Sequence, residues 1–186
     1  PSTKPQITAV NMDSSGYEAD IRPMDNIIKV DGTKIKRLEE FWEKSREPNA
    51  EIDLLVERDG KLFETRIVSR PVAYRDLKGI ERAHGQSGLT NFNGVRLEHI
   101  LSINGVARPE DDAALRQMLL DILDQPAQIR IKMAQSGSTE FLIYPRSDVN
   151  KGLMDPLNPD YNVFYFLQSY ESFYMRHGVI DAFWYS

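Results

Sequence analysis

The residues best suited to chemistry lie around Ser87, in the stretch His84-Gly-Gln-Ser-Gly88. A serine beside a glycine, with a histidine nearby, imitates part of a hydrolase site in which the histidine activates the serine hydroxyl. A nucleophile elbow, however, needs a strand before the serine and a helix after it. This polar, glycine-containing stretch predicts a loop instead. We therefore expect a polar loop here and no catalytic role for Ser87.

Other catalytic and metal-binding patterns are missing from the sequence. The histidines His84, His99 and His177 have no ligand spacing such as HxxxH, and the HExxH motif of zinc proteases does not occur. The chain has no cysteine, which excludes thiolate metal sites, cysteine nucleophiles and disulfides. Asp25 and Glu98 occupy equivalent positions of a repeat, so we interpret them as turn formers rather than an acid–base pair. We predict no enzyme activity, metal or cofactor for this chain.

Composition and charge are those of a globular protein that does not bind nucleic acid. The 186 residues are 41% hydrophobic and 27% charged, with a formal net charge of −5. Nucleic-acid binding would require a basic surface. No run approaches the roughly 20 apolar residues of a membrane-spanning helix. The chain begins with Pro and shows no signal peptide, so we expect a fragment whose targeting and anchoring elements lie outside it.

An internal repeat organises the chain. Residues 24–32 read MDNIIKVDG and residues 97–105 read LEHILSING. At one constant spacing, the matching positions are Asp25, Ile27, Val30 and Gly32 in the first copy and Glu98, Ile100, Ile103 and Gly105 in the second. A helix-like segment, a proline and two strands joined by a turn follow each copy. The sequence therefore predicts two copies of one supersecondary unit.

The elements expected around the first copy follow from local patterns. Strands are expected at 7–10 and 27–30, and a single helical turn at 17–21. Residues 35–47 predict an amphipathic helix ending near Pro48, because Leu38, Phe41 and Trp42 recur at helical spacing. An alternating strand at 52–56 and a returning strand at 62–68 predict a hairpin around Arg58-Asp59-Gly60-Lys61.

The second copy predicts a helix with apolar residues Leu115, Met118, Leu119 and Ile122, then strands at 129–133 and 141–144. Between the copies, residues 77–80 suggest a short strand or loop edge. Gly85, Gly88 and Gly94 favour a flexible loop over 83–94. After Pro145 the composition changes, since ten of the 18 aromatic residues lie between positions 161 and 185. This tail could be an added helix on the second unit, a partner or oligomer interface, or a membrane-interface segment.

These motifs resemble the PDZ family. In the bacterial pattern P-G-D-x-I-x-x-V-x-G, followed by a helix and a strand ending in R-D-G-K, the first copy departs only at Met24, which replaces the first glycine. Its matching residues are Pro23, Asp25, Ile27, Val30, Gly32 and Arg58-Asp59-Gly60-Lys61. The second copy is weaker: it keeps Ile100, Ile103, Asn104 and Gly105 but has Arg96-Leu97-Glu98 where the family prefers Pro-Gly-Asp. The chain is similar, over about residues 5–145, to the permuted PDZ domains of bacterial envelope proteases of the HtrA and site-2 types, some of which occur in tandem.

The resemblance implies an α/β (α+β) fold. We expect two PDZ-like partial β-barrels, each with one main helix, and an aromatic-rich C-terminal extension. The expected boundaries are 5–75 for the first domain, 76–147 for the second and 148–186 for the extension.

The resemblance also implies a site. PDZ domains bind extended peptides by adding a strand to a sheet edge beside a helix, and a hydrophobic-Gly-hydrophobic loop holds a carboxylate through its backbone amides. The stretch Leu77-Lys78-Gly79-Ile80 is similar to that loop, and the alternative is a simple linker turn. Groove positions on the two helices are Phe41, Trp42, Leu115 and Leu119, for which the alternative is a place in the core; Trp42 is the better groove candidate.

Two functions follow as hypotheses. The first is a peptide- or protein-binding module for protein or peptide C-termini, acting in substrate recognition, regulation or scaffolding. The family resemblance would make it extracytoplasmic (periplasmic) and the regulatory part of a membrane-anchored envelope protease. The second is a structural assembly module whose groove is plugged by its own chain, either by residues 83–94 or by the tail. An open groove beside a helix would favour the first, and a plugged groove the second.

Overall fold

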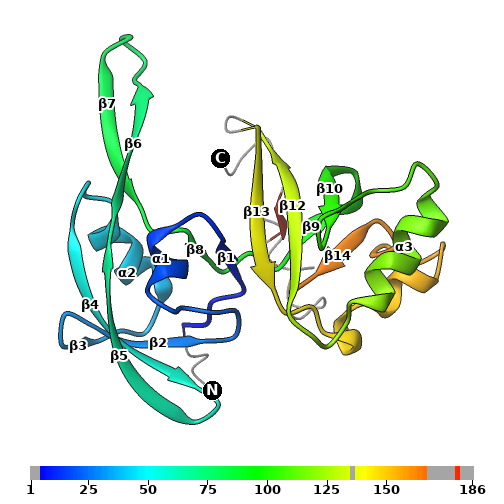
Figure 1. The fold of residues 1–186 in the computed structure, drawn as a ribbon, viewed down its shortest axis with the longest axis horizontal. Helices are drawn as coiled ribbons and strands as arrows, with labels where there is room; N and C mark the ends of the chain where they lie inside the picture. Colours follow the sequence, from blue (N-terminus) through cyan, green and yellow to red (C-terminus); the bar gives the residue numbers. More distant parts are fainter. Residues whose placement is uncertain (1–4, 135–136, 167–178, 181–186) are drawn as a thin grey trace. The chain divides into compact units, whose positions relative to one another are not determined.

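The computed structural model describes residues 5–134, 137–166 and 179–180, and it is mostly β-structure with a few helices (Figure 1). This content is consistent with the predicted α+β, PDZ-like fold class. The chain separates into two compact units, Pro1–Thr90 and Asn91–Ser186. The division falls after residue 90, whereas residue 75 was expected, because the Gly85 amide bonds to the Arg46 carbonyl and residues 89–90 pair with residues 9–10.

The main sheet of unit 1 has the strand order β3-β2-β4-β5. It consists of β2 (Asn26–Val30), β3 (Thr33–Lys34), β4 (Glu51–Arg58) and β5 (Lys61–Val68). Its two hairpins turn through Asp31-Gly32 and Asp59-Gly60, and all four residues have positive φ. Turns of this kind match the twist of antiparallel strands. The strand, the turn and the hairpin expected for the first copy are confirmed.

The core of unit 1 lies between this sheet, the helix α2 (Leu38–Ser45) and the short helix α1 (Ser15–Glu18). From α2, Leu38 and Phe41 are buried and Trp42 is partly buried. The helical turn expected at 17–21 begins earlier because Ser14 caps it, with its hydroxyl accepting from the Tyr17 amide at 3.2 Å. Buried hydrophobic side chains from all these elements form one cluster: Ile7, Val10, Ile21, Ile27, Val30, Ile35, Leu38, Phe41, Ile52, Leu54, Val56, Ile67 and Leu89.

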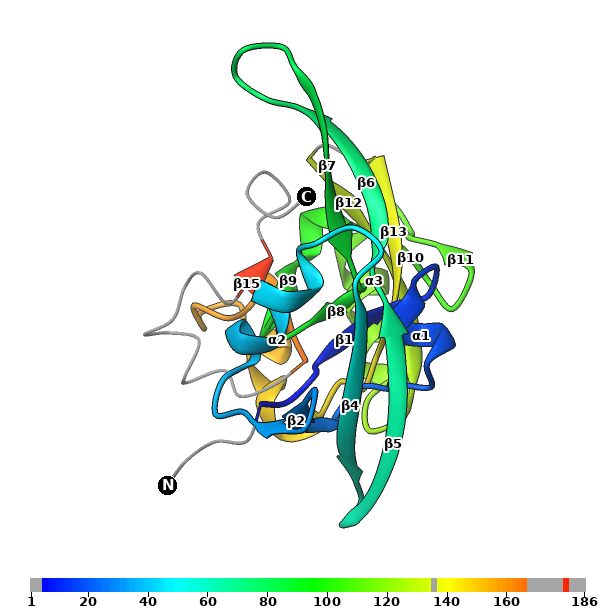
Figure 2. The same cartoon turned by 90° about the vertical axis from the view of Figure 1, so that its left-hand side faces the viewer.

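A second hairpin follows, made of β6 (Arg70–Arg75) and β7 (Glu81–Gln86), and it projects beyond the rest of unit 1 (Figures 1 and 2). The flexible loop predicted from the glycines is therefore wrong for residues 83–86. Gly85 donates its amide to the Arg46 carbonyl at 2.6 Å, and a Cβ here would lie 2.2 Å from the Ser45 carbonyl oxygen. Glycine is needed at this position for a close backbone approach rather than for flexibility.

Unit 1 closes with β8 (Leu89–Thr90), which pairs antiparallel with β1 (Ala9–Asn11). The register places Val10 opposite Leu89, and both side chains are buried in the core. Gly88, which leads into β8, has φ +81°, and a Cβ there would lie 2.2 Å from the Ser14 Cβ. The strand that completes unit 1 thus comes from a stretch expected to be a loop.

Unit 2 repeats the central pattern. The strands β10 (Ile100–Ile103), β11 (Val106–Ala107), β12 (Ala127–Met133) and β13 (Gly137–Ile143) pair in the order β11-β10-β12-β13. The first hairpin turns through Asn104-Gly105, again with positive φ. The helix α3 (Asp112–Asp121) buries Leu115 and Leu119. The strand, helix and hairpin expected for the second copy are confirmed.

Part of the aromatic tail belongs to unit 2. The 3₁₀ helices η1 (Leu97–His99), η2 (Ser147–Val149) and η3 (Lys151–Met154) connect its strands. β9 (Gly94–Arg96) pairs antiparallel with β14 (Val163–Tyr165) and parallel with β15 (Val179–Ile180). Phe164, Tyr165 and Phe166 are buried. The described start of the tail is therefore core, and the aromatic residues at 170–174 and 183–185 lie outside the described residues.

Candidate functional site

Two turns of the first copy are joined by one ion pair. The Asp25 carboxylate is only 1% exposed and accepts from Arg58 Nε and Nη2, both at 2.8 Å. It also accepts from the Arg22 amide at 2.8 Å. Hydrogen bonding to Asp25 raises the pKa of Arg58 above its ordinary value. Asp25 is thus a turn former, as predicted, and it also anchors the arginine of the Arg-Asp-Gly-Lys turn.

The equivalent turn of unit 2 is held differently. Glu98 is 70% exposed, and its carboxylate lies 3.7 Å from His99 Nε2. The turn is held instead by Arg108, whose Nη1 donates to the carbonyls of Leu97 at 2.8 Å and Ile100 at 2.9 Å. One arginine thus replaces the carboxylate–arginine pair, which accounts for the weaker motif in the second copy.

In unit 1 the side chain of Trp42 links α2 to β8. Its Nε1 donates to the backbone carbonyl of Leu89 at 3.3 Å. The carbonyls of Gly88 and Thr90 accept amides from β1, so the backbone groups of Leu89 point away from β1. The Leu89 amide lies 3.4 Å from the hydroxyl of Ser87. We call this contact the α2–β8 seam. Both outward backbone groups of Leu89 have partners within the chain.

An incoming peptide strand would need those outward groups, because strand addition relies on main-chain hydrogen bonds. The predicted groove residues fit this closed arrangement. Phe41, Leu115 and Leu119 are fully buried in the cores of their units, and Trp42 is the one that reaches the sheet edge. The structure does not bring Phe41 or Trp42 together with residues 77–80, which lie at the far end of the β6–β7 hairpin.

A comparable contact exists in unit 2 and was missed by sequence reasoning. Arg116 on α3 is 8% exposed, and its guanidinium carbon lies 3.5 Å from the ring centroid of Tyr161. Its Nη2 donates to Asn162 Oδ1 at 2.6 Å, and its Nε to the Tyr161 carbonyl at 3.4 Å. We call this contact, between α3 and the two residues that precede β14, the α3–β14 seam. Two features of the sequence are compatible with this contact: Arg116 directly follows Leu115, a predicted apolar helix position, and the C-terminal tail is rich in aromatic residues.

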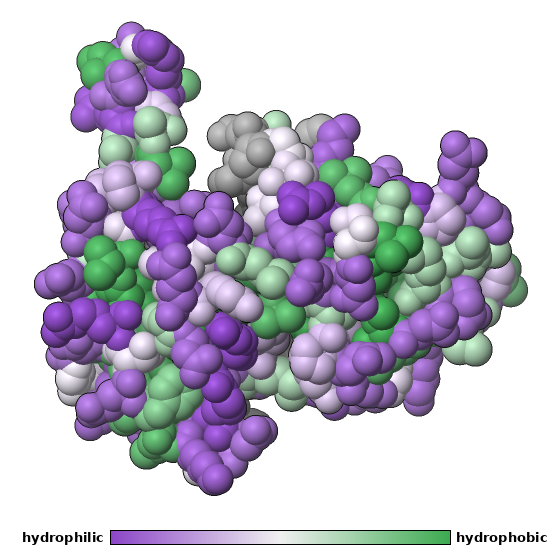
Figure 3. All heavy atoms as spheres, in the orientation of Figure 1, coloured by the Kyte–Doolittle hydropathy of each residue, from purple (hydrophilic) through white to green (hydrophobic). Residues whose placement is uncertain are grey.

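Residues 77–80 form the tip of the β6–β7 hairpin, and their amides are already engaged. The Asp76 carboxylate oxygen Oδ1 accepts from the amides of Lys78 and Ile80, each at 2.9 Å, and the Asp76 carbonyl accepts from Gly79 at 2.9 Å. The loop therefore does hold a carboxylate, but it is that of Asp76. The backbone amides of residues 78–80 are therefore not available to hold the carboxylate of a bound peptide. Leu77 and Ile80 are 108% and 50% exposed, and hydrophobic side chains are visible at the tip (Figure 3).

Ser87 and His84 do not form a catalytic pair. The Ser87 hydroxyl is buried next to the Leu89 amide, whereas His84 Nδ1 lies 3.2 Å from the Gly85 carbonyl oxygen and its ring lies against Tyr74. Within residues 5–134, 137–166 and 179–180, no group of three or more acidic, histidine or cysteine side chains is arranged to hold a metal. In the same ranges, no helix is both long and apolar enough to cross a membrane.

Comparison with known proteins gives a likeness among solved structures. No protein-family model matches the sequence, and none of the curated proteins matches it. Among solved structures, the chain is similar to the PDZ domain of the SdrC-like protein from Listeria monocytogenes. The two share 18% sequence identity over 48% of this chain and 90% of that domain, with a TM-score of 0.38.

Proposed function

We propose that this chain is a non-catalytic protein-interaction module that works in a protein assembly with its helix–strand seams closed. The observation behind this choice is the hydrogen bond from Trp42 to the Leu89 carbonyl. It occupies the sheet edge beside α2, where peptide capture would require an open groove. The α3–β14 seam supports the same choice, because residues of the chain itself lie beside the main helix of unit 2.

Partners would then bind to surfaces outside the two seams. Exposed large hydrophobic side chains mark one such surface, the tip of the β6–β7 hairpin, where Leu77 and Ile80 are held outward by an ordered turn. Such ordering lowers the entropy lost on binding. A rigid tip with exposed apolar side chains suits contact with a protein partner.

The test is an NMR titration of the nitrogen-15-labelled chain with a pool of peptides ending in small apolar residues. We expect no shifts at α2 or β8 for the natural sequence at millimolar peptide. Shifts clustered on Trp42, Leu89 and Thr90 would overturn the proposal and establish peptide capture. Trp42→Ala provides the matched open-edge variant, and Trp42→Phe, which keeps a ring but lacks the donor, separates loss of the hydrogen bond from loss of the ring.

We also propose an extracytoplasmic location, with the module tethered as a regulatory part of a membrane-anchored envelope protease. The support is the motif resemblance of residues 23–32 and 58–61, and the absence of cysteine is compatible with an oxidising compartment. The natural full-length protein should be digested by protease added to spheroplasts. Digestion only after the inner membrane is lysed would place the module in the cytoplasm and refute this location.

A further inference from the structure

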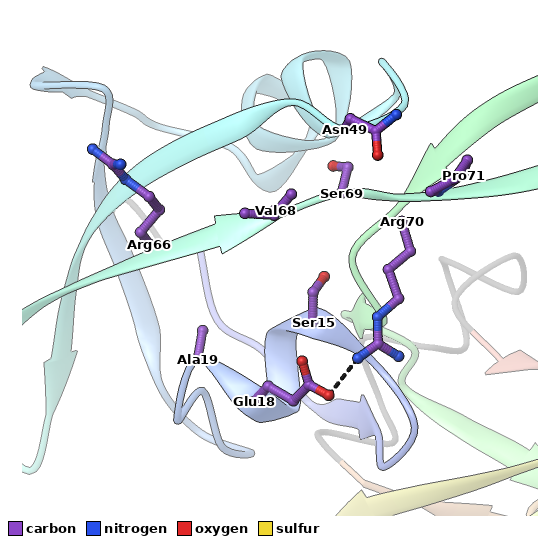
Figure 4. A pocket seen from close by; sticks show the side chains of 9 residues that line it. All are labelled: Ser15, Glu18, Ala19, Asn49, Arg66, Val68, Ser69, Arg70 and Pro71. Carbon is purple, nitrogen blue, oxygen red and sulfur yellow. Dashed lines mark hydrogen bonds and ion pairs between the residues drawn. The ribbon is translucent and has the colours of Figure 1, made fainter.

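A groove of about 320 Å³ runs between α1 and the outer edge of β5 (Figure 4). β5 is the outermost strand of its sheet, and α1 lies along that edge. Two contacts tie α1 to this part of the chain: the Thr65 hydroxyl on β5 donates to the carbonyl of Ala19, which ends α1, at 2.8 Å, and Arg70 at the start of β6 pairs with Glu18. The space is therefore built by the fold rather than left by a loose loop.

The groove contains the hydroxyl of Ser15 on α1. This residue is 7% exposed, and its buried hydroxyl has no hydrogen-bond partner among the residues that the structure describes. Figure 4 shows the hydroxyl directed from α1 into the space below β5. Buried hydroxyls without partners are rare because their desolvation is not compensated. A bound group that accepts a hydrogen bond would supply the missing partner.

Arg70 supplies the charged donor on the same side as Ser15. Arg66 also lines the groove, but Figure 4 shows its guanidinium turned away from Ser15, whereas that of Arg70 reaches toward Glu18 on α1. Arg66 is paired with Asp53 at 2.7 Å, and Arg70 with Glu18 and, at 3.3 Å, with Asp13. A guanidinium has more N–H donors than these contacts use, and it matches the planar geometry of a carboxylate.

We propose that this groove binds a carboxylate group, which accepts hydrogen bonds from the Ser15 hydroxyl and the Arg70 guanidinium. Glu18 competes with the ligand for Arg70, because its carboxylate pairs with that guanidinium. The carboxylate belongs either to an acidic side chain of a partner protein or to a free small acid. The site shares no residue with the α2–β8 seam, so the experiments on this site test it independently of the function proposed above.

The probes are two capped peptides, acetyl-Gly-Glu-Gly-amide and acetyl-Gly-Gln-Gly-amide, and sodium acetate, at constant ionic strength. Binding is followed by NMR of the nitrogen-15-labelled chain. We expect the Glu peptide to shift the amides of Ser15, Glu18 and residues 66–70, and the Gln peptide to leave them unchanged. Stronger binding of the Glu peptide than of acetate would identify a protein side chain as the source, and equal or stronger binding of acetate would identify a small acid.

Two variants that should change the affinity for the carboxylate probe in opposite directions make the test specific. Ser15→Ala should weaken binding of the carboxylate probe about tenfold, the usual effect of one hydrogen bond to a charged group. Glu18→Gln should strengthen it severalfold, because it removes the competing carboxylate. The controls Ser102→Ala and Glu64→Gln, which make the same chemical changes on side chains outside the groove, should bind like the natural chain.

The proposal is overturned if the Glu and Gln peptides give the same shifts or if neither shifts the groove. It is also overturned if Glu18→Gln leaves the affinity unchanged or lowers it. Glu18 is 68% exposed, so its substitution should leave the fold intact even if Ser15→Ala proves unstable.

Discussion

Trp42 Nε1 and the carbonyl oxygen of Leu89 lie 3.3 Å apart although 47 residues separate them in the chain. The bond joins the main helix of unit 1 to the strand that completes it. Because that carbonyl faces outward from the β1–β8 pair, the same bond that stabilises the unit also closes the edge to added strands. One contact therefore both contributes to the stability of unit 1 and blocks strand addition at this edge.

Replacing Trp42 should separate these two effects. Trp42→Phe loses one hydrogen bond and should cost about 1 kcal/mol, whereas Trp42→Ala also removes the ring and should cost about 3 kcal/mol. Amide hydrogen exchange at Leu89 and Thr90 reports the loss locally, which avoids assuming that the two units unfold together. If Trp42→Phe leaves exchange at Leu89 unchanged, the hydrogen bond contributes nothing and the seam is only a packing contact.

The equivalent carboxylates of the two copies should differ sharply in importance. Asp25→Asn breaks a buried ion pair with Arg58 and should cost about 3 kcal/mol, because the guanidinium loses its charged partner. Glu98→Gln changes a side chain that is 70% exposed and should stay within about 0.5 kcal/mol. Urea unfolding of both variants measures the difference. Equal effects would mean that the repeat positions have equivalent structural roles after all.

Gly85→Ala should loosen the β6–β7 hairpin. The added Cβ would lie 2.2 Å from the Ser45 carbonyl oxygen and 2.5 Å from that of Glu47, so β7 must move away from the end of α2 at a cost of about 1–3 kcal/mol. Faster amide hydrogen exchange at the neighbours of Gly85 in β7 would show that the hairpin has loosened. Gly105→Ala is the control, because its Cβ meets nothing within 4 Å and only the positive φ opposes the change. Unchanged exchange in β7 would show that the close approach is not needed.

Glu40 should make stability depend on pH. Its Oε2 accepts from the amides of Lys36 at 2.7 Å and Arg37 at 2.9 Å, and these bonds lower the pKa of Glu40 in the folded chain. A lowered folded pKa means that the stabilisation is complete above the ordinary glutamate pKa and is lost as the pH falls through the folded value. Glu40→Gln should therefore be less stable than the natural chain at pH 7 and equally stable at pH 2. The same difference at both pH values, measured by urea unfolding, would argue against this linkage.

Asp76 should control the order of the hairpin tip, whereas Leu77 should not. Asp76→Ala removes the acceptor of the Lys78 and Ile80 amides and should speed their hydrogen exchange. Leu77→Ser should change stability by less than about 0.5 kcal/mol, since the side chain is fully exposed. A larger loss with Leu77→Ser would mean that the tip packs against another part of the protein and is not available to a partner.

Local patterns predicted much of this fold. The turn glycines at 32 and 60, the helical spacing of Leu38 and Phe41, and the alternating strand at 129–133 each depend on neighbours in sequence. The structural roles of Gly85 and Arg116 could not be predicted, because their partners are distant in the sequence. Gly85 looked like a loop glycine because its packing partner, the end of α2, is far away in the chain. Arg116 gave no clear signal because Tyr161 and Asn162 lie 45 and 46 residues further on.

The pairing of β1 with β8 sets the order in which unit 1 can be finished. It joins positions 81 residues apart, as in the bond from the Thr90 hydroxyl to the Ala9 carbonyl. A growing chain that has reached residue 75 therefore still exposes the edge of β1 and leaves Trp42 uncovered, and closing so long a loop is slow. A fragment ending at residue 75 should remain incomplete and aggregate, and one that continues through Thr90 should fold. Cleavage of the projecting hairpin would, by the same reasoning, cut the connection to the strand on which the unit depends for closure.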